Sequence, residues 1–139
     1  MLGDRAHQKF VAKVSAKAPE YLEPGERVQD ALTGQTDAPP SSQVFGLIDA
    51  VRMITGKLQT RLVILTDRNV YVAHSRTLSP STIEEILIKH TRADAASLVS
   101  ISHGVVSVMG YDIFVSDGGR KRAARFVEAV AADDSSAST

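Results

Sequence analysis

Two short apolar segments separated by four polar residues constrain the fold most strongly. The first is Leu62-Val-Ile-Leu65 and the second is Val70-Tyr-Val-Ala73. Their β-branched and aromatic residues favour strands. Between them, Thr66-Asp67-Arg68-Asn69 contains the Asp and Asn that are typical of tight turns. The pattern therefore predicts a β-hairpin in the middle of the chain.

Further strands are predicted on both sides of this hairpin. A type II turn is expected at Pro24-Gly25, because proline fixes φ and glycine accepts the positive φ that the turn requires. A strand can then begin at Arg27. After the central hairpin, the sequence predicts a second hairpin and one more strand: residues 97–102, a turn at His103-Gly104, residues 105–109, and residues 111–115.

Two segments remain ambiguous, and one is a predicted loop. Residues 44–55 combine helical spacing of apolar residues with a Val and Ile content that suits a strand. In residues 78–91, Thr82 and Glu85 match a helix capping box, whereas the alternation of Ile86 and Ile88 fits a strand. The prolines and serines of residues 36–43 predict a surface loop.

Helices are predicted at both ends of the chain. Residues 4–18 carry an apolar side chain every four positions, with Asp4 as the N-cap and Pro19 as the stop. After a turn at residues 117–119, apolar residues recur with the period of an amphipathic helix: Ala123, Phe126, Val127 and Val130. The last residues, 133–139, are small and polar, and they are expected to be a disordered tail.

Length and composition exclude several classes of protein. A chain of 139 residues is expected to form one compact domain. Its 16 Lys and Arg balance its 16 Asp and Glu, so no global field draws it to nucleic acid, and no nucleic-acid partner is expected. No apolar run approaches the ~20 residues needed to cross a bilayer. The cations of the first 18 residues are spread out, unlike those of a secretory signal, so a soluble cytoplasmic protein is expected.

No pattern in the sequence predicts catalysis. The chain has no Cys, which excludes disulfides, thiolate nucleophiles and Cys-ligated zinc. Its four histidines do not have metal-ligand spacing, and neither a nucleophile elbow nor a Gly-rich phosphate loop occurs. We therefore expect a protein that is not an enzyme and has no catalytic residue, metal or cofactor.

Several motifs together resemble a known family. They are Leu22-Glu-Pro-Gly-Glu-Arg-Val28, Leu62-Val-Ile-Leu-Thr-Asp-Arg-Asn-Val-Tyr-Val72, Arg92-Ala-Asp94 and the final Asp-Gly turn into a helix. Over residues 20–131 they are similar to small bacterial pleckstrin-homology-like (PH-like) proteins. The resemblance implies a mainly β (α+β) fold: a bent antiparallel barrel or sandwich of about seven strands, capped by the C-terminal helix. It also implies that residues 84–90 form a strand.

The expected organisation follows from this resemblance. Residues 1–19 would be an extra amphipathic helix outside the family pattern, residues 20–132 the PH-like domain, and residues 133–139 the tail. In lipid-binding members of the wider superfamily, basic residues near the first hairpin loops hold phosphates. The residues here near a comparable loop are Arg52, Lys57 and Arg61, and they do not reproduce the usual basic motif.

Two further basic clusters are candidate binding sites. Arg5, Lys9, Lys13 and Lys17 form a cationic stripe on the N-terminal helix, which suits either a membrane or acidic partner, or a solvated face of a helix docked on its own domain. Arg120, Lys121 and Arg122 stand at the start of the C-terminal helix, where the helix dipole disfavours positive charge. That mismatch suggests a bound anion or acidic partner, or a helix that begins slightly earlier and tolerates the small energetic cost.

The expected function is that of an interaction module without enzymatic activity. Such a module would bind a protein or peptide, or a second copy of itself as a homodimer, through a sheet edge or an end of the barrel. The alternative is a peripheral membrane domain that binds anionic lipid headgroups through its local basic patches.

Overall fold

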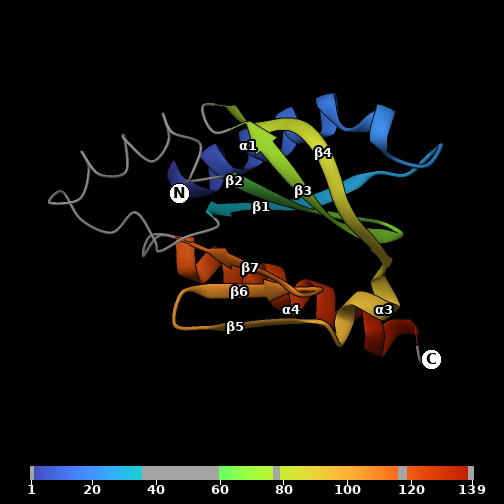
Figure 1. Ribbon diagram of the computed structural model, residues 1–139, viewed down its shortest axis with the longest axis vertical. Coiled ribbons are helices and arrows are strands. Elements are labelled where there is room, and N and C mark those ends of the chain that lie inside the picture. The colour runs from blue at the N-terminus through green and yellow to red at the C-terminus, as the bar shows by residue number, and fades with distance from the viewer. Residues whose placement is uncertain (1, 36–59, 77–78, 116–118, 138–139) are drawn as a thin grey trace, which may run out of the picture.

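The computed structural model describes residues 2–35, 60–76, 79–115 and 119–137, and this part of the chain is mainly β (Figure 1). Seven antiparallel strands form one sheet that is not closed into a barrel, with the order β4-β3-β2-β1-β7-β6-β5. The strands are β1 (Val28–Gln35), β2 (Thr60–Thr66), β3 (Asn69–Arg76), β4 (Ser79–Thr91), β5 (Val99–Ser102), β6 (Val105–Val108) and β7 (Tyr111–Phe114). The helices are α1 (Leu2–Lys17), a short 3₁₀ helix η1 (Pro19–Tyr21), α3 (Arg92–Ala96) and α4 (Arg120–Ala137).

The sheet consists of two layers that meet at one corner. Strands β1 to β4 form one antiparallel meander, and β5 to β7 form the other. In the described chain, the layers are joined by a single pair of residues, Gln35 of β1 and Phe114 of β7. At this corner Gly34 lies so close to β7 that a Cβ atom would stand 2.4 Å from Ile113 Cγ2 and 2.6 Å from the Phe114 carbonyl oxygen. The corner therefore requires glycine.

We predict that Gly34→Ala destabilises the fold by about 1–3 kcal/mol, because the added methyl group forces two strand backbones apart. Chemical denaturation of the variant against the wild type would measure the loss. Gly110→Ala is the control: nothing lies within 4 Å of its Cβ position, although its φ of +91° is unfavourable for alanine. A smaller loss at Gly34 than at Gly110 would contradict this account of the corner.

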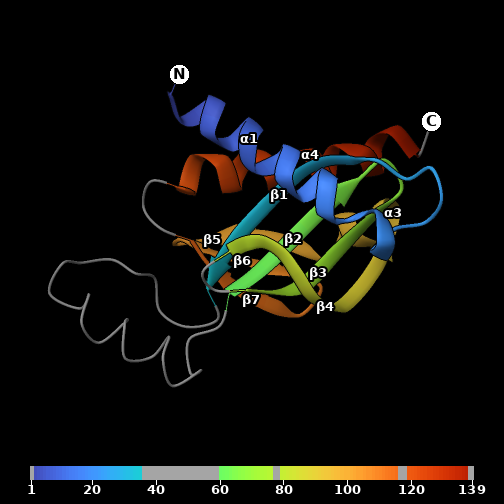
Figure 2. The ribbon, with the colours of Figure 1, turned by 90° about the horizontal axis from the view of Figure 1, so that it is seen from above.

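The first layer is buried on both faces, which explains why its strands are apolar throughout. One face carries Leu62, Ile64, Tyr71 and Ala73, which pack with Val14 and Ala18 at the α1 end of the chain. The other face contributes Val63, Leu65, Val70 and Val72 to a core that also contains Phe126 of α4 and residues of β6 and β7. Figure 2 shows α1 lying across the β1 to β4 layer. Helix α1 is thus a structural layer of the molecule.

The predicted central hairpin and the predicted turns at Pro24-Gly25 and His103-Gly104 are confirmed. The pairing of β2 with β3 begins at Leu65 and Val70, on either side of the turn. Strands β5 and β6 pair on either side of the turn at His103-Gly104. At Pro24-Gly25, the Glu26 amide donates to the Glu23 carbonyl at 3.0 Å and Gly25 has a φ of +82°, as a type II turn requires.

The structure also corrects several predicted boundaries. Helix α1 begins at Leu2, so Asp4 lies inside the helix and is not its N-cap. It ends at Lys17, and Pro19 begins η1, where the first position of a helical turn needs no amide donor. Helix α4 continues to Ala137, into the segment predicted as a disordered tail. Residues 36–43 and 44–55 and most of the turn at 117–119 lie outside the described residues.

Residues 79–91 form strand β4, so the capping-box interpretation of Thr82 and Glu85 is wrong. The register against β3 shifts between Val72 and Ala73 and again after His74, so irregular pairing breaks the strict alternation that marks a strand. Helix α3, which the sequence analysis missed, is capped by Thr91, whose hydroxyl accepts a hydrogen bond from the Asp94 amide at 3.2 Å. None of the described helices is long and apolar enough to span a bilayer.

Candidate binding cleft beside strand β1

Strand β1 has one edge that is largely unpaired within the described chain. Its other edge pairs with β2 along its length, whereas pairing with β7 is confined to Gln35. The Ala31 amide donates to Asp30 Oδ1 at 2.8 Å, so the main chain of Ala31 faces away from β2. Because the main-chain direction alternates along an antiparallel strand, Thr33 faces the same side as Ala31 and Gln35.

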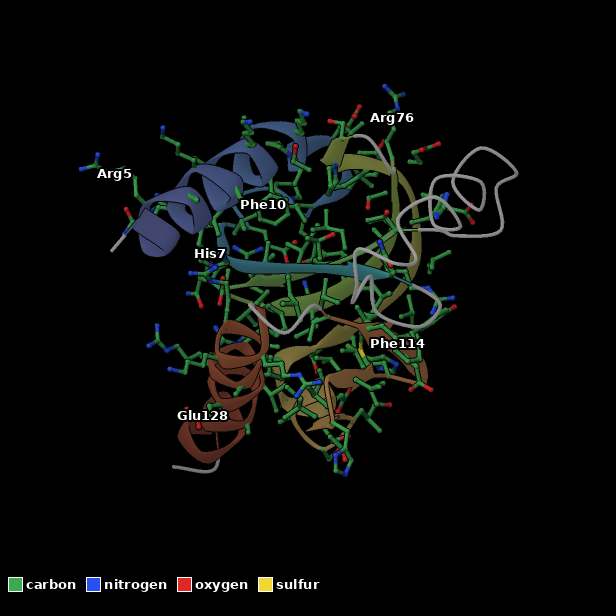
Figure 3. All side chains as sticks on the ribbon, turned by 90° about the vertical axis from the view of Figure 1, so that its left-hand side faces the viewer. Arg5, His7, Phe10, Arg76, Phe114 and Glu128 are labelled. Atoms are coloured by element: carbon green, nitrogen blue, oxygen red, sulfur yellow. The ribbon has the colours of Figure 1, made fainter. Side chains whose placement is uncertain are left out.

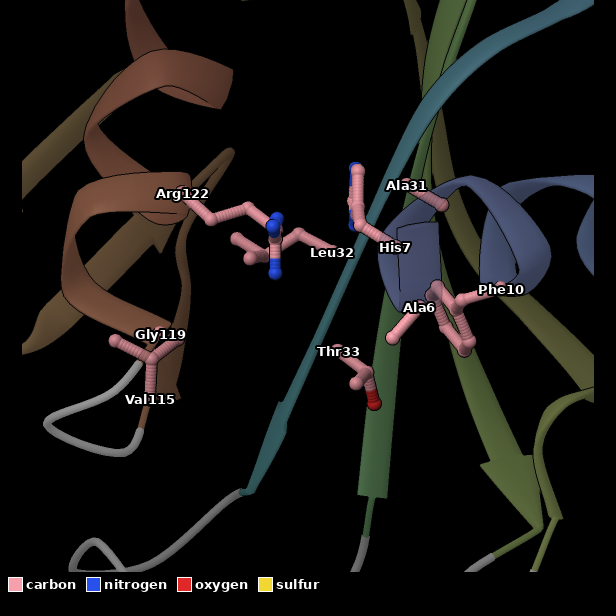
Figure 4. Close-up of a pocket in the computed structure, with 9 residues that line it drawn as sticks. All are labelled: Ala6, His7, Phe10, Ala31, Leu32, Thr33, Val115, Gly119 and Arg122. Carbon is pink, nitrogen blue, oxygen red and sulfur yellow. The ribbon is translucent and has the colours of Figure 1, made fainter. Parts of the chain in front are cut away.

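A cavity of about 270 Å³ lies along this edge, between α1 and α4. Figure 4 shows its lining residues: Ala6, His7 and Phe10 from α1, Ala31, Leu32 and Thr33 from β1, and Val115, Gly119 and Arg122 at the start of α4. Successive side chains of a strand point to opposite faces. Leu32 therefore lies on one side of the edge, and Ala31 and Thr33 lie on the other. The cavity reaches both sides of β1, and we call it the β1 cleft.

Two polar side chains enter the β1 cleft from opposite walls. His7 extends from α1 and Arg122 from α4, both toward β1 (Figure 4). His7 Nε2 lies 2.7 Å from Asp30 Oδ1, the same oxygen that accepts the Ala31 amide. This contact fastens α1 to β1. The remaining lining residues are mostly apolar, so the β1 cleft can hold an apolar side chain beside a charged one.

The cationic stripe of α1 lies on its solvent side. Arg5, Lys9 and Lys13 are exposed, and Figure 3 shows Arg5 directed away from the molecule. Lys17 is engaged at the other end of the helix, where it donates to Ser81 Oγ at 3.1 Å and Thr82 Oγ1 at 2.9 Å. The apolar face of α1 packs on the first layer of the sheet. The helix is therefore docked on its own domain, and all four cations remain on the surface, with Lys17 hydrogen-bonded to β4.

The three basic residues at the start of α4 point in different directions around the helix axis, so they face different surroundings. Arg120 and Lys121 are exposed in the first turn, whereas Arg122 is half-buried and lines the β1 cleft. The charge pattern predicted a cluster at the beginning of this helix, which α4 confirms by starting at Arg120. It did not indicate that the residues face different surroundings.

The predicted group of Arg52, Lys57 and Arg61 cannot be assembled from the described residues, because Arg52 and Lys57 lie outside them. Arg61 lies on β2 and its guanidinium carbon stands 4.9 Å from the centre of the Tyr111 ring. It also donates to the Asp112 carbonyl oxygen at 3.1 Å. Arg61 thus connects the two layers of the sheet.

A buried carboxylate, which the sequence analysis missed, lies at the other end of the first layer. Glu26 accepts hydrogen bonds from the Tyr71 hydroxyl at 2.6 Å, Asn69 Nδ2 at 2.8 Å, the Glu23 amide at 2.9 Å and the Thr66 hydroxyl. Burial by itself raises the pKa of Glu26. The hydrogen bonds that the charged form accepts outweigh it, so the pKa lies below its ordinary value of 4.5. Burial and Glu26 together raise the pKa of Tyr71.

The half-exposed Glu23 completes this network. Its Oε2 lies 2.8 Å from Lys89 Nζ, and its Oε1 lies 3.7 Å from an Arg68 nitrogen. The hydrogen bond from Lys89, with a second one from Asn69, lowers the pKa of Glu23. The cluster binds the 23–26 turn to the central hairpin and, through Lys89, to β4, so we assign it a structural role.

Arg92 has a similar structural role. Its guanidinium donates to Gln29 Oε1 at 2.6 Å, the Thr66 carbonyl at 3.2 Å and the Ala129 carbonyl of α4 at 3.4 Å. The resemblance motifs at residues 22–28, 62–72 and 92–94 therefore stabilise the fold. The signal in the sequence was a Glu, a Thr and an Asn beside otherwise apolar strands.

The described residues contain no group of three or more His, Asp or Glu side chains that could hold a metal ion. Comparisons with protein-family models, with curated proteins and with solved structures find no match to this chain. The proposed function therefore rests on the geometry of the β1 cleft and its surroundings.

Proposed function

We propose that this chain is a PH-like interaction module without enzymatic activity, and that it binds an extended segment of a partner protein in the β1 cleft. Seven antiparallel strands followed by a terminal helix support the PH-like assignment, because the resemblance implies about seven such strands and a C-terminal helix. The observation that carries the binding proposal is that the cavity lies along an edge of β1 that, among the described residues, pairs only at Gln35.

An extended segment in this position would add a strand to the sheet. The outward-facing amide and carbonyl of Thr33 and the carbonyl of Ala31 would bond to its main chain. Its side chains would point alternately toward α1 and toward α4. Main-chain bonds would supply affinity, and the two walls of the β1 cleft would supply selectivity.

The outer edge of β4 is a weaker candidate for strand addition. Its register against β3 is irregular, and its exposed side chains include Glu84, Glu85 and Lys89. Bulges and charged residues are devices that protect a sheet edge from pairing with other chains. The regular edge of β1 lacks these charges between Ala31 and Gln35.

Selection of a displayed random-peptide library against the full chain tests this proposal. We expect selected peptides to bind the wild type and to shift the amide resonances of β1 and of the cleft walls. Thr33→Pro removes the outward amide, and it also removes the hydrogen bond that the Thr33 hydroxyl donates to the Arg61 carbonyl of β2 at 3.3 Å, a bond that Thr33→Ala removes as well. Loss of the outward amide should weaken binding roughly tenfold. Thr33→Ala keeps the amide and is the matched control, with affinity close to that of the wild type.

Several outcomes would contradict the proposal. They are the absence of any selected peptide, peptides that bind away from β1, and equal affinity of the two Thr33 variants when both melt like the wild type. Salt-sensitive sedimentation with phosphatidylserine vesicles, without peptide binding, would instead favour the peripheral membrane role. If the solution mass of the wild type doubles as its concentration rises, while Thr33→Pro remains monomeric, the bound segment comes from a second copy of the chain.

A further inference from the structure

We infer that the segment bound in the β1 cleft places a bulky apolar side chain, such as that of leucine or phenylalanine, against α1, and that Ala6 limits its size. This inference rests on the proposed function, since it specifies the chemistry of the segment. The α1 side of the β1 cleft is lined by Ala6, Phe10, Ala31 and Thr33. Figure 4 shows these four residues on one side of β1 and Leu32 on the other.

The pairing of β1 determines which side chains of an added strand would face α1. Ala31 and Thr33 pair with Ile64 and Leu62 of β2, whose side chains belong to the core on the α1 face of the sheet. Residues directly opposite each other in an antiparallel pair point to the same face. The two residues of the segment opposite Ala31 and Thr33 would therefore point toward α1.

Small side chains create the space on this side of the β1 cleft. Ala6 and Ala31 carry only a methyl group each, and the ring of Phe10 is partly buried against the core between α1 and the sheet. The whole cavity measures about 270 Å³. A dry cavity of about 150 Å³ lined by apolar side chains is large enough for benzene. One bulky side chain therefore fits beside Phe10.

The lining on this side favours an apolar occupant. Among the four side chains, only that of Thr33 has a polar group, and its hydroxyl already donates to the Arg61 carbonyl at 3.3 Å. A polar side chain that entered would give up hydrogen bonds with water that this lining does not replace. An apolar side chain would instead gain free energy by leaving water.

Ala6 is the residue that sets the size of this space. It is exposed, so a larger side chain there would occupy the cavity without disturbing the core. The same turn of α1 is held against β1 because His7 Nε2 lies 2.7 Å from Asp30 Oδ1. The space beside Ala6 is therefore formed before the segment binds, which lowers the cost of binding.

Parallel selections from the same peptide library test this inference, using the wild type, Ala6→Phe and Ala12→Phe as targets. The wild type should enrich bulky apolar residues at one position of the peptide, and changing that residue to alanine should weaken binding roughly tenfold or more. Ala6→Phe fills the space, so it should enrich glycine, alanine or serine there and bind the alanine-substituted peptide at least as well as the parent peptide. Ala12→Phe is the matched control: it adds the same ring at an exposed position of α1 outside the cavity lining, and it should keep the bulky preference.

Failure of this inference differs from failure of the proposed function. Ala6→Leu guards against a ring that turns out of the cavity in Ala6→Phe, because its branched side chain should still exclude phenylalanine from the segment. Peptides that bind the β1 cleft without enrichment of bulky apolar residues would overturn the inference alone. So would a bulky preference that both Ala6 variants retain while they melt like the wild type. The absence of cleft-binding peptides would overturn both.

Discussion

Replacing Glu26 with alanine should lower the free energy of unfolding by about 3–5 kcal/mol. The carboxylate holds four donors at the base of the central hairpin: the hydroxyls of Thr66 and Tyr71, the amide side chain of Asn69 and the main-chain amide of Glu23. Without it, the buried Thr66 and Asn69 side chains lose an acceptor that water cannot readily replace. The predicted loss of stability arises because these buried donors would be left without an acceptor.

Chemical denaturation at neutral pH would measure this loss. Glu23→Ala is the matched control, because it removes a half-exposed carboxylate from the same turn and should change stability by about 1 kcal/mol or less. Glu26→Gln keeps the size of the side chain but cannot accept at both ends, so it should fall between the two. Equal losses for Glu26→Ala and Glu23→Ala would show that the network does not hold the turn.

The advantage of the wild type over Glu26→Ala should depend on pH. Because folding lowers the pKa of Glu26, its stabilisation is complete above the ordinary value of 4.5 and is lost as the pH falls through the lower folded value. Folding raises the pKa of Tyr71, so its stabilisation is complete below its ordinary value of 10 and declines as the pH rises beyond that value. Denaturation curves across this range would detect both losses.

Val14→Asp should reduce stability by about 4 kcal/mol or more, enough to abolish cooperative folding of an ordinary domain. Val14 is fully buried where α1 meets the first layer, in a cluster that includes Leu62, Ile64 and Tyr71. An aspartate there would be an unpaired charge among apolar groups. The same outcome is expected for any change that detaches α1 from the sheet.

Thermal melting of Val14→Asp beside Ala12→Asp provides the test. Ala12 is exposed on the same helix, so its variant adds the same charge with an expected change within about 0.5 kcal/mol. If both variants melt like the wild type, α1 is not a structural layer of the protein.

Local patterns predicted the strands other than β4, the turns at Pro24-Gly25 and His103-Gly104, and both terminal helices, because hairpin residues and apolar periodicity act over a few positions. The pattern of residues 78–91 left β4 ambiguous, and only the family resemblance favoured a strand there. The role of α1 was harder to predict. Its cationic stripe was compatible with a membrane or an acidic partner, whereas the spacing of Phe10 and Val14 was compatible with packing on its own domain. The packing of both faces of that sheet, which the sequence analysis did not predict, explains the unbroken apolar runs around Leu62 and Val70.

The β1 cleft could not be predicted from the sequence, because its walls come from opposite ends of the chain. Arg122 was identified as a basic residue at the start of a helix, but the rotation of α4 about its axis decides that it faces β1 while Lys121 faces solvent. Likewise, the pairing of His7 with Asp30 depends on how α1 crosses the sheet. These relations arise only from tertiary packing.

The position of the β1 edge also limits by size what can reach it. An unprotected edge on the perimeter of a protein invites other folded sheets to join it and form aggregates. Here, α1 and α4 stand on either side of that edge, as Figure 3 shows, so a folded sheet would have to pass between the two helices to pair with β1. A single extended segment needs less room than a sheet, so this arrangement would guard the edge against fibre formation while leaving it accessible to such a segment.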